Sequence, residues 1–214
     1  MQLPNLIFNG GFKAGTTSLF RYLAKHPDIY ESSKKEIHYF TPLVFGEDKP
    51  SLPIDEYSGF FTCEEEKYRV EASPAYIYGG EKVIKSMKHV LPDDHKVLLI
   101  LRNPLDRLIS YYKHIRSQFL ISDDFPVFLE NCFDEFYASE EFRKGYYKNA
   151  IREGLYIQYL PVWEKHYQSN LIIVFFDDLK NGTLPLMRNI LEWLGISKDF
   201  YRKTGLRMRF AEFK

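Results

Sequence analysis

The sequence is short of cysteine, and this scarcity excludes a disulfide-stapled fold. Cys63 and Cys132 are the two cysteines among 214 residues, too few for the disulfide framework of small secreted proteins. Residues 1–9 show no basic leader followed by a long apolar stretch. No window approaches the roughly 20 apolar residues of a membrane span. We therefore expect a cytoplasmic protein without a transmembrane segment.

The sequence also lacks an excess of charge of either sign. Lysine and arginine total 29, as do aspartate and glutamate, so the formal net charge is zero. A general nucleic-acid-binding protein usually carries a basic excess, and we expect no nucleic-acid partner. The six histidines and two cysteines show no metal-ligand spacing, so we expect no metal. Anion binding must come from a few well-placed basic side chains.

Apolar runs that alternate with helical patterns predict an α/β fold. Strands are expected at residues 6–8, 68–71, 97–101 and 171–176. Helices are expected at residues 16–26, 81–90, 104–118, 125–138, 155–167 and 184–194. This order favours a parallel β-sheet with helices on both faces, in a single domain over residues 1–214. We interpret residues 41–66 as a long irregular excursion, either a lid or an acceptor-facing loop.

The glycine-rich turn after the first strand predicts an anion site. Residues 10–18 read Gly-Gly-Phe-Lys-Ala-Gly-Thr-Thr-Ser. Glycine lets the backbone approach an oxyanion, the following helix points unpaired N–H groups at it, and hydroxyl groups add donors. The predicted binding residues are Lys13, Ala14, Gly15, Thr16, Thr17 and Ser18.

A nucleoside-triphosphate P-loop is one alternative for this turn. It requires Gly-Lys-Ser/Thr at its end, but Thr16 stands where the lysine belongs, and Lys13 precedes Gly15 by two positions. A P-loop kinase would also need an acidic residue to hold magnesium. Asp177 and Asp178, at a predicted strand end, keep that alternative open.

A second basic group follows the strand at residues 97–101. Arg102 stands at the strand end, and Ser110 lies about two turns into the helix that Pro104 begins. The guanidinium can bind a phosphate through two N–H groups, and the serine can donate a further bond. An arginine paired with Asp106 and a serine on a helix surface is the plainer interpretation of this segment by itself.

Together, the two segments resemble the sulfotransferases that use 3′-phosphoadenosine 5′-phosphosulfate (PAPS). The family's 5′-phosphosulfate loop reads Lys-x-Gly-Thr-Thr-Ser, and its 3′-phosphate site has an Arg-x-Pro turn with the same arginine–serine spacing. The resemblance implies the sulfotransferase fold, with PAPS as donor and 3′,5′-adenosine bisphosphate (PAP) as product. It also implies that Lys13 reaches the oxygen bridging phosphate and sulfur. Two matches in the right order are more specific than either alone.

Catalytic candidates lie in residues 34–40, Lys-Lys-Glu-Ile-His-Tyr-Phe. Glu36 and His38 alternate in a segment that we expect to be extended, so both side chains face one side. A solvated charge cluster is the plainer interpretation of such a run. The segment resembles the Lys-x-Glu-x-His-Phe-Phe stretch of the heparan-sulfate-type branch. The resemblance implies that Glu36 is the general base, and we expect His38 to hydrogen-bond the sulfuryl group or the acceptor.

Later segments resemble the family with one departure. Tyr156 belongs to a Gly-x-Tyr helix start that flanks the nucleotide, and Arg207 belongs to a basic tail that could close over the 3′-phosphate. Ala72 stands where the carbohydrate branch has lysine. This departure leaves two alternatives, a neutral acceptor or a lysine supplied by Lys34 or Lys35.

The sequence therefore predicts sulfuryl transfer from PAPS to a hydroxyl or amine of a carbohydrate-like or small-molecule acceptor, without a metal. The alternatives are a P-loop kinase and a non-catalytic nucleotide-binding module of the same fold. Ala72 motivates the second alternative, and the retention of Lys13 and Glu36 opposes it. The identity of the acceptor and the oligomeric state are left open.

Overall fold

The computed structural model describes residues 1–62 and 65–203, and its centre is a five-stranded sheet. Neighbouring strands all pair in parallel, in the order β2-β3-β1-β4-β5. The strands are β1 (Leu6–Gly10), β2 (Ile29–Glu31), β3 (Tyr68–Ala72), β4 (Lys96–Leu101) and β5 (Leu171–Phe175). The predicted parallel α/β fold is confirmed.

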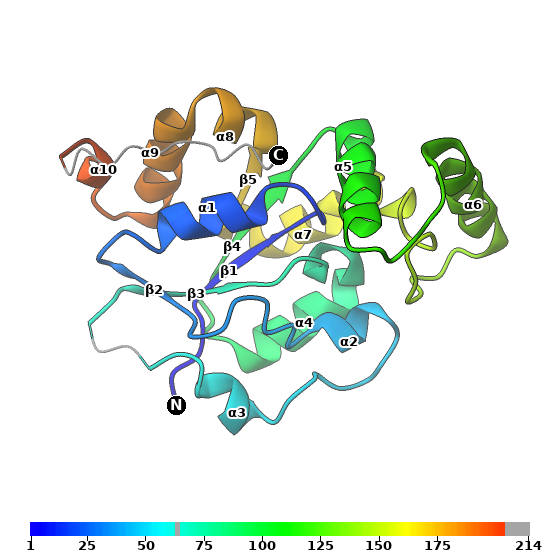
Figure 1. The fold of residues 1–214 in the computed structure, drawn as a ribbon. Coiled ribbons are helices and arrows are strands. Elements are labelled where there is room, and N and C mark those ends of the chain that lie inside the picture. Colours follow the sequence, from blue (N-terminus) through cyan, green and yellow to red (C-terminus); the bar gives the residue numbers. More distant parts are fainter. Residues whose placement is uncertain (63–64, 204–214) are drawn as a thin grey trace.

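Successive side chains of a strand point to opposite faces, so each face of the sheet gathers its own hydrophobic core. On β1, Leu6 and Phe8 pack on one face and Ile7 packs on the other. The first face is covered by α1 (Thr16–Leu23), α8 (Phe176–Asn181), α9 (Thr183–Leu194) and α10 (Phe200–Lys203). The opposite face is covered by α2 (Thr41–Val44), α3 (Ile54–Ser58), α4 (Gly80–Val90) and α7 (Leu160–Tyr167). Figure 1 shows α1 and α9 above the strands and α2, α3 and α4 below them.

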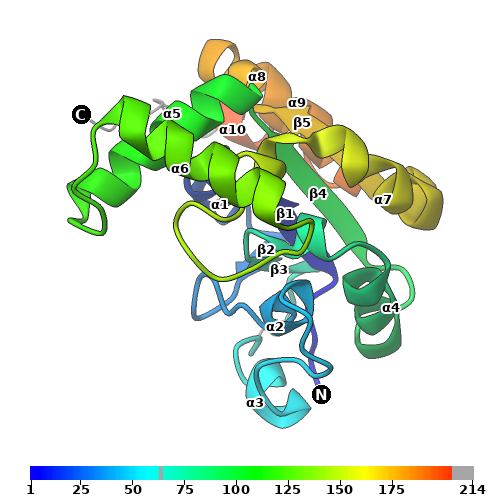
Figure 2. The ribbon, with the colours of Figure 1, turned by 90° about the vertical axis from the view of Figure 1, so that its right-hand side faces the viewer.

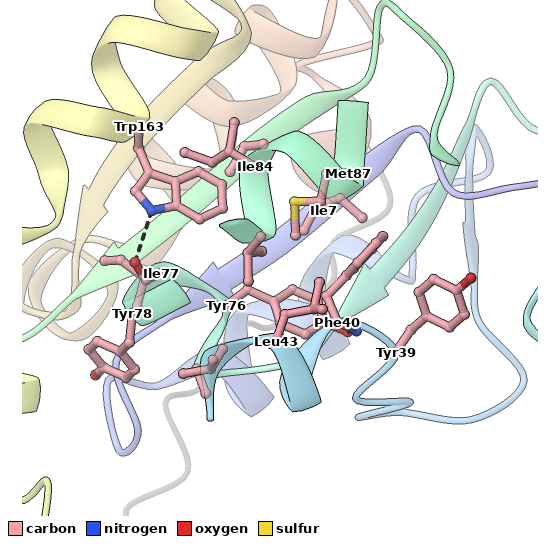
Figure 3. Close-up of a cluster of buried hydrophobic side chains, with 14 of the residues drawn as sticks. Ile7, Tyr39, Phe40, Leu43, Tyr76, Ile77, Tyr78, Ile84, Met87 and Trp163 are labelled. Carbon is pink, nitrogen blue, oxygen red and sulfur yellow. Dashed lines mark hydrogen bonds between the residues drawn. The ribbon is translucent and has the colours of Figure 1, made fainter. Parts of the chain in front are cut away.

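The second face holds large aromatic side chains, and a tryptophan anchors α7 to it. The Trp163 indole N–H donates a hydrogen bond to the carbonyl oxygen of Ile77 at 2.9 Å, as Figure 3 shows. Ile77 lies in the 3₁₀ helix Tyr76–Gly79, which follows β3 and leads directly into α4. Because Trp163 is fully buried, this bond satisfies a polar group that would otherwise be costly.

Beside the sheet, α5 (Pro104–Ser117) and α6 (Phe125–Ala138) form a helical pair with a small core of its own (Figure 2). Asn103 caps α5, since its side-chain oxygen accepts hydrogen bonds from the backbone N–H of Leu105 at 3.0 Å and of Asp106 at 3.3 Å. Pro104 occupies the first turn, where its missing N–H is not needed. These two residues make α5 begin directly after β4 and Arg102.

The structure differs from the predicted elements in several places, among them α8 and α10, which were not predicted. The helix predicted over residues 155–167 begins only at Leu160, after 3₁₀ turns at Arg152–Gly154 and Tyr156–Gln158. Pro161 explains this late start, because it has no N–H to donate to a preceding turn. Residues 41–66 are not wholly irregular, since they contain α2 and α3. The sequence pattern does not reveal β2, because three residues are too few to show a period.

The 3₁₀ turn Gln168–Asn170 links α7 to β5, and α8 follows β5 without a loop. Within the two described ranges, no helix is long and apolar enough to cross a bilayer.

Candidate active site

The turn between β1 and α1 lies at the carboxyl end of the central strand. The backbone N–H of Ala14 donates to the carbonyl of Gly11 at 3.1 Å, and Lys13 and Gly15 have positive φ angles of 68° and 91°. A Cβ on Gly15 would lie 2.6 Å from the Phe176 ring in a conformation that side chains rarely adopt, so this position requires glycine. The turn directs the first N–H groups of α1 beyond the edge of the sheet.

The hydroxyl residues predicted to bind phosphate form the first turn of α1. Thr16, Thr17 and Ser18 are each partly exposed, and no side chain caps this helix because its N-cap residue is Gly15. Ala14 is fully buried in the core beneath them, so only its backbone can contribute to binding. The structure therefore presents three hydroxyl groups beside the helix terminus.

Arg102 joins the second predicted motif to the first. Its Nη1 donates to the carbonyl oxygen of Lys13 at 3.1 Å, and its guanidinium lies over the Phe176 ring, 4.3 Å from the centroid. Burial lowers the pKa of Arg102, and Asp106 and Asp177 raise it from nearby. Neither acid forms an ion pair with Arg102 in the described part of the chain. Asp106 therefore acts on Arg102 from a distance and does not form a direct ion pair with it.

Tyr156 lies against the same turn. Its hydroxyl is 3.2 Å from the point where a Cβ would stand on Gly11, and the Tyr78 hydroxyl is 3.3 Å from that point. Arg107, which is fully buried, forms an ion pair with Glu153 at 3.0 Å. Burial raises the pKa of Glu153 to about 7, and Arg107 opposes this shift. A buried polar layer therefore supports the turn.

Within the described part of the chain, two buried donors at this turn lack a partner, as do the Nε atoms of Arg107, Arg143 and Arg152. Arg102 Nε and Tyr156 Oη are buried and have no hydrogen-bond partner among the described residues. Burial raises the pKa of Tyr156, and Arg107 and the backbone N–H of Arg102 lower it. Leaving such groups unpaired costs about 1–3 kcal/mol each. Phosphate oxygens would satisfy both atoms, so the residues present fit a phosphorylated ligand.

The other predicted anion-binding residues have different outcomes. Ser110 lies in the second turn of α5 and is partly exposed, and its contact with a phosphate stays a prediction. Arg207 lies outside the described residues, so its role also stays a prediction.

His114 was missed by the sequence analysis. Burial lowers its pKa, and so does Lys13, which therefore lies close to it. Its position four residues after Ser110 places both on one helix face and is the signal that could have found it.

Glu36 and His38 lie together, but not in an extended segment. Both residues have positive φ angles, of 59° and 61°, which cost roughly 1–3 kcal/mol each for residues other than glycine. His38 Nε2 is 3.7 Å from Glu36 Oε2. The chain turns back onto β3 here, where the N–H of Glu36 donates to the carbonyl of Ala72 at 3.1 Å. The prediction of an extended segment is wrong, because two left-handed residues, and not strand alternation, bring the side chains together.

Lys35 completes this group. Its Nζ contacts Glu36 Oε1, and the contacts with His38 and then Lys35 lower the pKa of Glu36 to about 2, against the effect of burial. Burial and Arg102 lower the pKa of Lys13, whereas Glu36 raises it. The carboxylate therefore lies within electrostatic reach of the lysine in the turn after β1. The structure brings the two predicted motifs into one site.

The surroundings of Ala72 distinguish the two lysines suggested as substitutes for a lysine at that position. Ala72 is buried in the core on the α1 face of the sheet. The side chain of Lys34 is exposed, whereas Lys35 contacts the carboxylate of Glu36. Of the two, Lys35 is the one that lies at the candidate site. Across the described ranges there is also no group of three or more His, Cys, Asp or Glu side chains that could hold a metal ion.

Comparison with known proteins identifies the family. The model of the sulfotransferase domain matches residues 6–214. The human bifunctional heparan sulfate N-deacetylase/N-sulfotransferase 1 is 30% identical over 218 residues, an alignment that covers 95% of this chain and 23% of the human protein. The chain thus spans about a quarter of the length of this relative.

Solved structures agree with this match. The sulfotransferase from Alicyclobacillus acidocaldarius superposes with a TM-score of 0.82 at 26% identity, covering 98% of this chain and 87% of that one. Mouse sulfotransferase SULT7A1, solved in complex with PAP, has the same fold, with a TM-score of 0.58 at 17% identity over 92% of this chain and 60% of that one. The chain belongs to the sulfotransferase family.

Proposed function

We propose that this domain transfers a sulfuryl group from PAPS to a hydroxyl or amine of a carbohydrate-like or small-molecule acceptor. The observation that carries the proposal is the meeting of Lys13 and Arg102 at the carboxyl ends of β1 and β4. In open parallel sheets, ligands bind at this edge, where the chain changes direction across the sheet. Buried donors without partners at this edge match the phosphate groups of such a nucleotide.

PAPS supplies an activated sulfuryl group on a phosphate leaving group. Lys13 and the N–H groups at the start of α1 stabilise the negative charge that develops on the departing phosphate. Arg102 and Ser110 bind the other phosphate end of the nucleotide. A transferring sulfuryl group carries less charge than a phosphoryl group, so basic side chains suffice for this stabilisation.

Glu36 takes the proton from the attacking acceptor group. Its pKa of about 2 keeps the carboxylate ionised across the neutral range. The same low pKa makes it a weak base while Lys35 and His38 remain against it. The acceptor therefore has to loosen the contact with Lys35, and His38 is then free to hydrogen-bond the acceptor or the sulfuryl group.

The carbohydrate acceptor is supported by the relatives. The human protein that aligns with nearly the whole chain is named for N-sulfation of heparan sulfate. Ala72 supplies no charge, but Lys35 lies at the site and places one positive charge beside Glu36. We expect this charge to orient an acceptor that carries hydroxyl, amine or weakly acidic groups.

Calorimetric titration with PAP tests the nucleotide site. We expect micromolar binding by the wild-type protein, weakened roughly tenfold or more by Lys13→Ala and by Arg102→Ala, because each variant removes a charged contact to phosphate. Lys25→Ala is a matched control, since Lys25 is an exposed lysine beyond the far end of α1. Tight binding of ATP with magnesium and none of PAP would support a kinase instead. No binding of PAP by the folded protein would contradict the proposal.

A further inference from the structure

Glu71 is a buried carboxylate on β3 that is satisfied by hydroxyl groups. Its side chain is fully buried, and Tyr57 donates to its Oε2 at 2.6 Å. Ser73 and Tyr76 both donate to its Oε1, at 2.7 Å and 2.5 Å. Among the described residues, Glu71 forms no ion pair. Burying a carboxylate without a cation is costly, and these three hydroxyl groups offset that cost.

Two of these hydroxyl groups also reach the segment that holds Glu36 and His38. The N–H of His38 donates to Ser73 Oγ at 2.9 Å, and the N–H of Phe40 donates to Tyr76 Oη at 3.3 Å. A hydroxyl has one proton, so donating it to Glu71 leaves the oxygen lone pairs for a backbone N–H. Oε1 of Glu71 therefore orients two chains of hydrogen bonds, which we call the relays: one runs through Ser73 to His38 and one through Tyr76 to Phe40. Both relays end on residues 36–40, the catalytic segment.

The catalytic segment needs such restraint because its backbone is strained. Glu36 and His38 both adopt left-handed conformations, which persist only where the surroundings determine them fully. Burial of Ile37 and Phe40 holds the segment against the protein, and Figure 3 shows Phe40 beside Tyr76 in the core. Burial does not choose a backbone conformation, whereas the relays fix the N–H directions on both sides of the His38 to Tyr39 link.

We propose that Glu71 is a positioning residue for sulfuryl transfer. Its Oε1 holds Glu36 and His38 in their working geometry through Ser73 and Tyr76, although Glu71 itself touches no substrate. The proposal rests on the proposed function. It predicts that breaking either relay misplaces the base and the histidine while leaving the nucleotide turn after β1 intact.

Single hydroxyl deletions test the relays. We expect Ser73→Ala and Tyr76→Phe to lower kcat by roughly 10- to 100-fold, because small displacements of catalytic groups have effects of that size. The affinity for PAP and the KM for PAPS should stay within about two-fold of wild type, since the nucleotide contacts are unchanged. Amide hydrogen exchange at His38 in Ser73→Ala, and at Phe40 in Tyr76→Phe, should become faster.

Two matched variants remove a buried tyrosine hydroxyl without touching a relay. Tyr57→Phe deletes the donor to Oε2 of Glu71, and Tyr68→Phe deletes a bond of 2.6 Å to the carbonyl of Leu194 on the opposite face of β3. We expect both variants to keep kcat within about two-fold and to leave exchange at His38 and Phe40 unchanged. A loss of kcat equal to that of Tyr76→Phe would show a general effect of stability and overturn the proposal.

Substitution of Glu71 itself separates the roles of its oxygen and its charge. Glu71→Leu removes the acceptor and should lower kcat at least as much as the worse relay variant. Glu71→Gln can keep an oxygen toward Ser73 and Tyr76 and turn its amide toward Tyr57, so it should recover most of the activity. Full activity of a folded Glu71→Leu variant would overturn the proposal.

Failure of the proposed function gives a different result from failure of this inference. If the wild-type protein binds no PAP and turns over no acceptor with PAPS, the function is wrong, and the exchange measurement still decides whether the relays restrain the segment. If wild type is active and Ser73→Ala matches it in both kcat and exchange at His38, the positioning role is wrong and the function stands.

Discussion

The nucleotide side and the acceptor side of the site differ in how their polar groups are satisfied. On the nucleotide side, Arg102 Nε and Tyr156 Oη are buried without partners in the described part of the chain. On the acceptor side, Glu36 has Lys35 on one oxygen and His38 near the other. The nucleotide side therefore has donors available for an anion, whereas on the acceptor side Lys35 already compensates the charge of Glu36.

This difference predicts an asymmetry in binding. We expect the nucleotide turn to accept phosphate without rearrangement, because Arg102 is held against the Phe176 ring and the carbonyl of Lys13. We expect the acceptor side to exchange an internal contact for a contact with substrate before Glu36 takes a proton. Three substitutions test this contrast.

The largest effect is expected from Glu36→Gln. Loss of the general base should lower turnover by roughly 10²- to 10⁴-fold, while PAP affinity stays near the wild-type value because Glu36 does not belong to the phosphate turn. Initial rates at saturating PAPS and calorimetry measure the two quantities. Glu31→Gln, an exposed carboxylate at the end of β2, is the control. Unchanged turnover in Glu36→Gln would remove the assignment of Glu36 as base.

A smaller effect is expected from Arg102→Lys. This variant keeps the positive charge but loses the planar fork that can donate to Lys13 and to a phosphate at once. We expect PAP binding about tenfold weaker, measured by calorimetry. Arg21→Lys, on the exposed side of α1, should bind PAP like wild type. Equal affinities for all three proteins would show that Arg102 acts as a point charge only.

The smallest effect is expected from Lys35→Ala, and it is a shift in pH dependence. The folded pKa of Glu36, about 2, lies below its ordinary value of 4.5, so in wild type the carboxylate stays ionised until the pH falls well below 4.5. Without Lys35 that pKa rises, and the acid limb of the kcat/KM profile should move to higher pH. Lys34→Ala, which removes an exposed lysine, should leave the limb in place. Identical profiles for the two variants would show that Lys35 does not tune Glu36.

The adjacency of the glycine turn and Arg102 could be predicted from the sequence because each directly follows a buried strand, whereas their binding of phosphate stays a prediction. Carboxyl ends of neighbouring parallel strands meet at one edge, so a glycine turn after β1 and an arginine after β4 have to lie together. The extended conformation expected for Glu36 and His38 was wrong, since their left-handed geometry depends on contacts with β3. The hydroxyl groups that donate to Glu71 depend on tertiary context, and the late start of α7 depends on a single proline. The cytoplasmic location stays a prediction.

The central place of β1 in the sheet has a consequence for the order of folding. β1 comes first in the chain, yet its partners are β3 and β4, and the bond from Arg102 to the carbonyl of Lys13 spans 89 positions. During synthesis the residues of the glycine turn emerge first, and Arg102, which contacts the turn, emerges 89 positions later. Contacts so distant in sequence form slowly. Nucleotide affinity should therefore arise in a single late step of folding, and the bound nucleotide would stabilise the finished sheet and not its precursors.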